Sequence, residues 1–433
     1  MDYSNEPHGV FMLIDSRSFY ASVECVERGL NPLKEPLVVM SEQENTNGGL
    51  ILATSPEAKK LYGLQANVSR QRDLPDDDRL MVVPPRMNLY IKKNLQINQI
   101  FARYAAPADL WPYSIDESIL DLSHSWHLFG DSIRDVARRI QKDIRHELGL
   151  YTAVGIGQNP VQAKLALDLY AKHEKELIGQ ITYENVPQKI WPITDLTSVW
   201  SIGERTAKHL NRMHIHTMYD LAHSNPYAIK QEMGIVGTQL FALAWGIDRA
   251  HPQVRIKVKS ASLSNSQVLP RDYARKSEIE IVIKEIGEQV AARLRHHRKQ
   301  AAEVSLGIGF SYRASEEDGR SGFSGRLRID PTNDNSAIAA ALLRIFNQNW
   351  DGQVIRNVAV SCNRLVEDTG QQLDLFSPAS TQIKRTDLER TVDQIRGRFG
   401  FTALVYAKSA QRGGTAINRA SLVGGHNGGN SYE

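Results

Sequence analysis

Three carboxylates occupy positions from which they could hold metal ions. The apolar run at residues 10–14 ends in Asp15, and Asp116 and Glu117 lie next to each other in the segment 113–118. Carboxylate oxygens are the ligands that Mg²⁺ prefers, and the ion usually shares its coordination with substrate phosphates. Two such ions about 3.5–4 Å apart can clamp the attacking and leaving oxygens of an in-line phosphoryl displacement. If the carboxylates converge at strand ends, the sequence predicts a magnesium-dependent site for phosphoryl transfer.

The same three residues also have a purely structural explanation. Asp15 could cap the helix that follows it, because Asp is a favoured residue at helix N-termini. Asp116 and Glu117 could fill a hairpin turn, where Asp is also favoured. Spacing alone leaves both explanations open.

The elements that would carry these residues have the pattern of an α+β domain. Residues 10–14 and 37–40 are short apolar runs typical of buried strands, and residues 19–28 have the spacing of a short helix. Residues 132–148 place apolar side chains at helical spacing, and an apolar strand follows at 151–156. Strands and helices arranged in this way predict an α+β fold for the first part of the chain.

The rest of the chain divides into further regions. Residues 196–248 contain short helical stretches broken by glycine and proline, which predicts a small all-helical module, and residues 248–260 have the pattern of a linker. Residues 261–367 predict a second α+β domain, and the Gly-, Ser- and Thr-containing tail after Asp368 is expected to end in a flexible segment at 413–429. The expected elements are helices at 278–298, 335–349 and 386–399 and strands at 304–310, 325–329 and 356–360.

Composition excludes several classes of protein. The chain has 433 residues, 41% of them hydrophobic, which at about 150 residues per domain suggests about three domains. The two cysteines, Cys25 and Cys362, are too few for a disulfide framework or a cysteine zinc site, and they are expected to be buried thiols. The polar N-terminus and the short apolar run after it do not resemble a secretion signal. A secreted protein is therefore excluded, and a cytoplasmic one is expected.

Charge is distributed unevenly along the chain. The net charge is only +3, but residues 255–299 hold 11 basic against 5 acidic side chains. Residues 73–79 are instead acidic and contain a proline, which is typical of a solvated loop. The basic stretch favours a polyanionic partner, and an ordinary charged surface is the alternative for both stretches.

Two of these motifs together resemble the signatures of the Y-family, or translesion, DNA polymerases. They are residues 14–24, which include Asp15, and residues 113–118, which include Asp116 and Glu117. A third segment, 154–164 with its continuation to Lys172, resembles the palm motif that follows in this family. The resemblance extends from about residue 10 to 365 and is closest to the UmuC-like branch. It implies a multidomain α+β right-hand polymerase with a palm at 1–24 and 85–190, fingers at 25–84, an all-helical thumb at 191–250, a linker at 251–260, an α+β little finger at 261–367 and a tail at 368–433.

The resemblance also assigns roles within the expected active site. It implies that Asp15, Asp116 and Glu117 are catalytic and bind two Mg²⁺ ions, with the backbone carbonyl of Ser16 as a further ligand. Tyr20 matches the family's steric gate, an aromatic ring under the sugar that leaves no room for a 2′-hydroxyl and so excludes ribonucleotides by clash.

Two lysines match the family's contacts to the nucleotide triphosphate. They are Lys59 and Lys172, which would supply positive charge and hydrogen-bond donors. The sequence departs from the family nearby, because Pro56 stands where many members have tyrosine and Pro160 stands where a lysine is common. A solvated surface lysine is the alternative at both positions.

The segment 199–210 resembles a helix-hairpin-helix motif. Such a turn aims backbone N–H groups at a phosphate, and the helix N-terminus adds partial positive charge, so binding ignores base sequence. Gly203, Arg205 and Lys208 are the expected DNA contacts, whereas Ser201 replaces a glycine that is usual in these turns. A simple packing corner between helices is the alternative. The basic stretch 255–299 matches the little finger in position and would grip DNA phosphates in a salt-dependent way.

A short peptide in the tail resembles the segment by which bacterial polymerases attach to the sliding clamp. It lies between loop-like sequences, where exposed apolar side chains are hard to explain as core and are typical of peptide recognition. The expected clamp-binding residues are Gln372, Leu373, Leu375 and Phe376.

The resemblance therefore implies an error-prone translesion DNA polymerase that acts in DNA damage tolerance and the SOS response. Its expected partners are primer–template DNA, dNTPs and the sliding clamp, with a UmuD-like subunit or a recombinase filament as a further requirement of the UmuC-like branch, and the catalytic chain is expected to be monomeric. A nucleotidyl cyclase uses a similar carboxylate site but needs neither a helix-hairpin-helix nor a clamp peptide. An inactive scaffold that binds DNA and clamp is the other alternative, although all three carboxylates are present.

Overall fold

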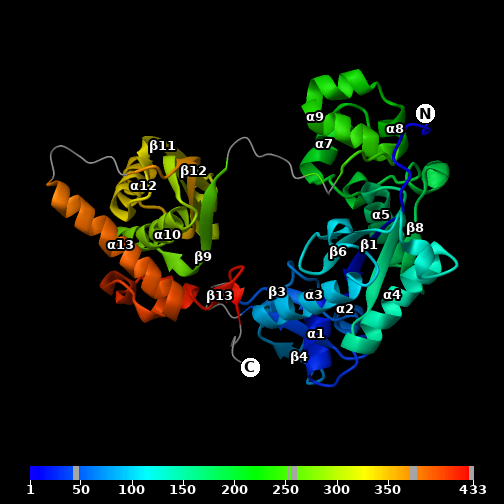
Figure 1. Cartoon of the computed structure of the whole chain (residues 1–433), viewed down its shortest axis with the longest axis horizontal. Helices are drawn as coiled ribbons and strands as arrows, with labels where there is room; N and C mark the ends of the chain where they lie inside the picture. Colours follow the sequence, from blue (N-terminus) through cyan, green and yellow to red (C-terminus); the bar gives the residue numbers. More distant parts are fainter. Residues whose placement is uncertain (42–47, 252–253, 255–260, 371–377, 429–433) are drawn as a thin grey trace.

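The computed structural model describes residues 1–41, 48–251, 254, 261–370 and 378–428. Within these residues the chain forms two α+β regions, a helical region and a C-terminal segment (Figure 1). No helix in this part of the chain is long and apolar enough to cross a membrane.

A five-stranded sheet forms the centre of the first region, with strand order β5-β6-β1-β7-β8. β1 (Phe11–Ser16) lies in the middle and pairs antiparallel with β6 (Glu117–Asp121) and β7 (Thr152–Gly157). Side chains alternate along β1, since Met12 and Ile14 belong to one buried cluster and Leu13 to another. The outer strands are β5 (Leu110–Pro112) and β8 (Ile178–Gln180).

Helices cover both faces of this sheet. α3 (Met87–Phe101) and α4 (Ile133–Leu148) pack on the face of Met12 and Ile14. α5 (Pro160–Ala166) packs on the other face, where Ala163 meets Leu13. Because both faces are buried, the sheet holds its strand ends in fixed positions.

A smaller sheet joins the first one through α1 (Phe19–Glu27). It has three strands in the order β3-β2-β4 and carries α2 (Pro56–Tyr62). One side of α1 packs into the core of the large sheet through Phe19, and the other side packs on the small sheet through Ala21 and Cys25. The strands are β2 (Leu37–Met40), β3 (Ile51–Thr54) and β4 (Met81–Val83).

The helical region follows the first α+β region and has its own apolar core. Its helices are short, and the longest changes direction at Gly234, which has a φ of 63°. The helices are α6 (Val186–Lys189), α7 (Glu204–Arg212), α8 (Met218–His223) and α9 (Pro226–Ala244).

The second α+β region is an antiparallel four-stranded sheet in the order β11-β10-β12-β9, with two long helices packed on it. The sequence patterns predicted its two long helices and three of its strands. They missed β9 because its exposed half is polar and shows no apolar alternation. The elements are β9 (Leu263–Tyr273), α10 (Lys276–His296), β10 (Lys299–Phe310), α11 (Tyr312–Asp318), β11 (Gly322–Thr332), α12 (Asn335–Asn349) and β12 (Ile355–Glu367).

The C-terminal segment is not the flexible tail that its composition predicts. α13 (Ala379–Phe399) packs on the second α+β region, and its start lies seven residues before the predicted one at 386. A short helix, α14 (Ala416–Arg419), and a hairpin of β13 (Leu422–Val423) and β14 (His426–Asn427) follow. The composition misled because glycines here form a specific turn rather than a loose chain.

Gly155 in β7 is a test of how tightly α5 is packed on the large sheet. A Cβ atom at this position would come within 2.1 Å of the Ala163 carbonyl oxygen and 2.4 Å of the Leu167 amide nitrogen. Backbone atoms cannot move aside as a side chain can, so Gly155→Ala should lower the free energy of unfolding by about 1–3 kcal/mol in urea denaturation.

Gly307 in β10 provides the matched control for that substitution. The nearest atom to a Cβ there is the Ala359 Cβ at 3.6 Å, which is an ordinary contact. Gly307→Ala should therefore change stability by less than about 1 kcal/mol. Equal losses in the two variants would contradict the close approach of α5.

Candidate active site

The pairing of β1 with β6 brings the predicted carboxylates together. Asp15 lies directly opposite Glu117 in the strand register, and the Ser16 N–H donates to the Asp116 carbonyl oxygen over 2.9 Å. Asp15 does not cap the next helix, because Ser18 is the N-cap of α1 and lies in the left-handed region with a φ of 49°. The capping explanation of Asp15 is therefore wrong.

Asp116 lies in the turn between β5 and β6, as the structural explanation expected. The Ser114 hydroxyl bonds to the Asp116 carboxylate over 2.6 Å and also accepts the Glu117 N–H. This hydrogen bonding fixes the turn beside the end of β1. A role in the turn and a role toward a ligand are thus compatible for Asp116.

Burial and like charge raise the pKa of Asp15. Burial is the largest cause, and the nearby charges of Asp116 and Glu117 raise the pKa further, while Lys172 opposes them. The Lys172 ammonium lies 2.7 Å from Asp15 and 3.0 Å from Asp168. Burial alone would lower the pKa of Lys172, but these two ion pairs outweigh it and raise it. The site concentrates negative charge, and a lysine offsets part of it.

Lys164 plays the corresponding part for Glu117. Its ammonium lies 2.7 Å from Glu117 and 3.2 Å from Asp168, so Asp168 links the two lysines. Neither the motifs nor the family resemblance gave Lys164 or Asp168 a role. The signal was present, because residues 164, 168 and 172 are spaced four apart and so share one face of a helix.

The donor set fits a hard divalent cation. Carboxylate oxygens and a strand-end carbonyl are the ligands that Mg²⁺ takes. Burial, and to a smaller extent the charges of Asp116 and Glu117, raise the pKa of Asp15, so its ionised form would be favoured by a nearby cation. As the side chains stand, no three Asp, Glu, His or Cys residues in the described part of the chain gather closely enough to hold an ion by themselves. Lys172 and Lys164 hold Asp15 and Glu117 instead.

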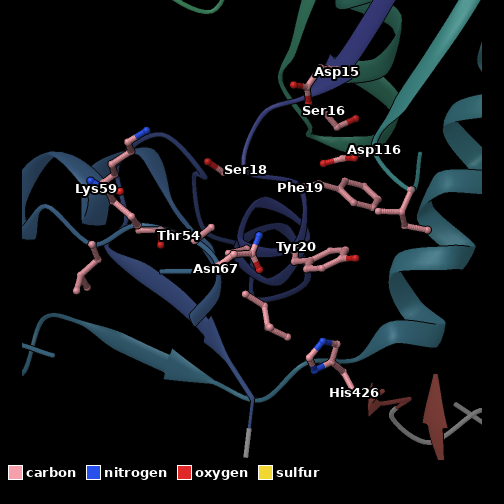
Figure 2. A pocket seen from close by; sticks show the side chains of 16 residues that line it. Asp15, Ser16, Ser18, Phe19, Tyr20, Thr54, Lys59, Asn67, Asp116 and His426 are labelled. Atoms are coloured by element: carbon pink, nitrogen blue, oxygen red, sulfur yellow. The ribbon is translucent and has the colours of Figure 1, made fainter. Parts of the chain in front are cut away.

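A cleft of about 680 Å³ opens beside these carboxylates (Figure 2). Asp15 and Asp116 lie at one end of it, Lys59 on α2 lies at another side, and the Tyr20 ring lies between Asp116 and His426. Tyr20 and Lys59 were predicted to contact a nucleotide, whereas Lys172 contacts Asp15. The lining residues are Asp15, Ser16, Ser18, Phe19, Tyr20, Leu52, Ala53, Thr54, Lys59, Leu64, Gln65, Ala66, Asn67, Ile115, Asp116 and His426.

The Tyr20 ring is held in place by a second ring and a buried carboxylate. It stacks on Tyr90 with the ring centroids 4.3 Å apart and an interplanar angle of 13°. The Tyr90 hydroxyl donates to Glu24 over 2.9 Å, and Arg86 holds the same fully buried carboxylate at 2.7 Å. A ring fixed in this way can exclude a group by steric clash, because it cannot turn aside.

The two prolines that depart from the family pattern both begin helices. Pro56 is the first residue of α2, where Ser55 caps the helix, and Pro160 is the first residue of α5, where Asn159 caps it. Proline is favoured at this position because its missing N–H would have no helical partner. These helices carry Lys59 and Lys164, so the prolines help to place the two lysines.

The other predicted residues lie away from the cleft. Gly203 is the N-cap of α7, and Arg205 and Lys208 are exposed on that helix. Ser201 has a φ of 71°, so the preceding turn adopts the left-handed conformation that a glycine would favour. DNA binding by this turn stays a prediction. The predicted clamp-binding residues, Gln372, Leu373, Leu375 and Phe376, lie outside the described residues.

Comparison with known proteins decides the family. The model of the impB/mucB/samB family matches residues 14–168, and the model of its C-terminal domain matches residues 260–375. The chain belongs to this family, the Y-family DNA polymerases. It is 38% identical to UvrX of Bacillus subtilis (strain 168), a protein named for UV-damage repair, over 98% of this chain and 99% of that one. It is 36% identical to DNA polymerase IV 2 of the same organism over 96% and 98% of the two chains.

A solved structure supports the same fold. A Y-family DNA polymerase chimera superimposes with a TM-score of 0.64 over 83% of this chain and 99% of that chain, at 18% identity. The prediction of a multidomain α+β right-hand polymerase is therefore confirmed. The individual domain boundaries and the roles of the site residues stay predictions.

Asp15 gives the site a testable dependence on pH. Because its pKa is raised in the folded protein, its ionised form destabilises the fold at pH values above that pKa. Asp15→Asn should therefore raise the free energy of unfolding at pH 8, measured by denaturation with a chelator present. The gain should shrink as the pH falls toward the ordinary aspartate value, where the native carboxyl is also neutral.

The control for this measurement is Asp131→Asn, since Asp131 is exposed before α4 and lies in no predicted site. In that variant, the free energy of unfolding should differ between pH 8 and pH 5 by the same amount as in the native chain. A less stable Asp15→Asn protein at pH 8 would show that the ion pair with Lys172 outweighs the cost of burying the charge.

Proposed function

We propose that this DNA-directed DNA polymerase is an error-prone translesion enzyme that acts in DNA damage tolerance of the SOS type. The observation that carries the proposal is that two of the carboxylates, the fixed Tyr20 ring and Lys59 line one cleft, with the third carboxylate paired opposite Asp15 in the sheet. The names of the relatives support a role in repair, since one is named for UV-damage repair and others are named DNA polymerase IV.

The chain's own residues suit phosphoryl transfer from a dNTP. Asp15, Asp116, Glu117 and the Ser16 carbonyl would hold two Mg²⁺ ions, which when bound supply charge stabilisation to the attacking and leaving oxygens. Lys59 would donate to the triphosphate from across the cleft.

The two lysines behind the carboxylates have a positioning role in this proposal. Lys164 and Lys172 hold Glu117 and Asp15 at fixed places beside the cleft through the ion pairs described above. Because each lysine also contacts Asp168, it keeps a partner when its carboxylate turns toward a ligand. The contacts of Lys172 are therefore with the carboxylates of Asp15 and Asp168. A contact between Lys172 and the triphosphate stays a prediction.

Tolerance of damaged templates follows from the small part of the chain that faces the nucleotide. Part of the cleft wall comes from β3, α2 and the residues just after α2, all within residues 52–67. A short wall encloses the new base pair loosely, so discrimination depends on base pairing and on the gate ring. Low fidelity and low processivity are the expected results.

The proposed partners extend beyond DNA and dNTPs. The segment that includes Leu375 and Phe376 would attach the enzyme to the sliding clamp as an extended peptide. A UmuC-like identity, with its UmuD-like subunit or recombinase filament, stays a prediction, because the relatives described above carry the names UvrX and DNA polymerase IV. An inactive scaffold that binds DNA and clamp stays the alternative. Only a measurement of polymerase activity distinguishes it from an active enzyme.

Primer extension tests the proposed activity. The native chain with Mg²⁺ and single dNTPs should extend a primer on an undamaged template and past an abasic site. Asp116→Ala should abolish both, because a carboxylate beside Asp15 is lost, while DNA binding stays. Extension that survives in Asp116→Ala would contradict the assigned metal site. A native chain that binds DNA and clamp without any extension would favour the scaffold.

The gate ring predicts a specific loss of sugar discrimination. Tyr20→Ala should raise the incorporation of ribonucleotides relative to deoxyribonucleotides on the order of tenfold or more, because the ring no longer excludes the 2′-hydroxyl. Tyr20→Phe keeps the ring and its stacking on Tyr90, so it is the matched control and should retain discrimination. Equal behaviour of the two variants in single-nucleotide insertion would contradict the gate.

A further inference from the structure

The C-terminal hairpin is formed by a specific turn. Gly424 and Gly425 connect β13 and β14 and have φ values of 60° and 85°. Two consecutive residues with positive φ are what a two-residue hairpin turn requires, and glycine adopts them without steric cost. The sequence Val423-Gly-Gly-His426 therefore encodes a hairpin rather than a flexible end.

This hairpin packs on the first α+β region, close to the start of α3. The Asn88 N–H donates to the Gly428 carbonyl oxygen over 2.9 Å. Val423 packs against the apolar core between the large sheet and the helices α3 and α4. Figure 1 shows β13 beside the part of the molecule that contains α3 and β3. The hairpin is thus in contact with the region that forms the cleft.

The residues just before the hairpin are held on α10 of the second α+β region. The Glu285 carboxylate is 4% exposed and accepts the Thr415 and Ala416 N–H groups over 2.9 and 3.0 Å. Lys408 forms an ion pair with Glu288, and Arg412 lies 3.2 Å from Glu278. The buried Glu285 carboxylate at the start of α14 makes this attachment specific, because an unpaired buried charge would be costly.

The two attachments are separated by very little chain. α14 ends at Arg419 and β13 begins at Leu422, so only Ala420 and Ser421 lie between them. The position of α10 and the position of the hairpin are therefore coupled. The C-terminal segment connects the second α+β region to the cleft independently of the chain around residues 251–260.

His426 is the residue that this segment places in the cleft. Figure 2 shows its ring near Tyr20, at the opposite end from Asp15 and away from Lys59. Burial lowers the pKa of His426, so its ring is neutral at neutral pH. A neutral aromatic ring suits a sugar or a base by stacking, whereas the triphosphate requires the charged end of the cleft.

We propose that the C-terminal hairpin completes the nucleotide-binding cleft and that His426 is a positioning residue that contacts the sugar or base of the incoming nucleotide. The inference rests on the proposed polymerase function, which places a nucleotide in this cleft. It deepens that function, since it assigns the wall beside Tyr20 to residues more than 300 positions away in the sequence.

Equilibrium binding tests this role without requiring chemistry. The full-length protein is bound to a primer–template with a dideoxy-terminated primer and titrated with the matching dNTP and Mg²⁺ in a calorimeter. His426→Ala should raise the dissociation constant of the dNTP about three- to tenfold, as expected for loss of one aromatic contact. His426→Phe should restore most of the affinity, because the ring is replaced. The dissociation constant of DNA should not change.

A control and a truncation separate positioning from general disruption of the tail. Asn418→Ala alters an exposed residue of α14 and should bind the dNTP as the native chain does. A chain that ends at Ser421 lacks the hairpin and should match His426→Ala. Native-like affinity in both His426→Ala and the truncated chain would overturn the inference.

A disulfide tests whether the cleft binds the dNTP while the hairpin is held in its observed position. A Cβ atom on Gly428 would lie 3.0 Å from the Asn88 side chain, and the native cysteines are buried, so Asn88→Cys with Gly428→Cys should cross-link on mild oxidation. The cross-linked protein should bind the dNTP with native affinity. Loss of binding that dithiothreitol reverses would show that the docked hairpin blocks the cleft, and it would overturn the proposal.

Failure of the proposed function gives a different result from failure of this inference. A native chain that binds the dNTP but extends no primer contradicts polymerase activity alone, and the effect of His426→Ala on binding still decides the role of the hairpin. A chain that extends primers with unchanged dNTP binding in His426→Ala contradicts the inference alone.

Discussion

The concentration of carboxylates at the end of β1 is the constraint on which the site depends. Asp15 and Glu117 face each other across a strand pair whose register is fixed by a sheet with helices packed on both faces, so their repulsion cannot be relieved by moving apart. Lys164 and Lys172 offset this charge from the neighbouring α5 and the turn after it. They can reach it only because α5 lies against β7, where Gly155 and Gly157 leave room for the helix backbone.

The same constraint explains why the lysines are shared rather than paired one to one. Asp168 contacts both of them, so each lysine has two acidic partners and the group keeps a net negative charge. Partly buried ion pairs contribute little net stability when isolated, but removing one member leaves a charge without compensation. A network of this kind can release a carboxylate to a cation while its lysines stay paired.

Sequence patterns predicted the fold where burial alone determines the residue types. The helix at 335–349 and the strand at 37–40 were predicted with their observed bounds, since each shows an uninterrupted apolar pattern. β9 was missed because one face of an edge strand is exposed, and its residues 264–267 are all polar. In the site, motif resemblance pointed to Asp15, Asp116 and Tyr20, which lie in one cleft, but not to Asp168 or His426. The four-residue spacing of Asp168 from Lys164 and Lys172 was a usable signal, whereas the position of His426 depends on tertiary structure.

The position of His426 in the cleft illustrates why such residues cannot be found from local sequence patterns. Closing a loop between residues far apart in the chain costs conformational entropy that no local pattern records. Contacts outside the cleft offset that cost. The buried Glu285 carboxylate binds the Thr415 N–H, and the turn at Gly424 and Gly425 allows the hairpin to form. The sequence features that place His426 in the cleft are therefore the Glu285 anchor and the glycine turn at residues 424–425. Neither of them lines the cleft itself. A polar, glycine-rich end of a chain can thus be held beside a distant cleft when its anchor is buried.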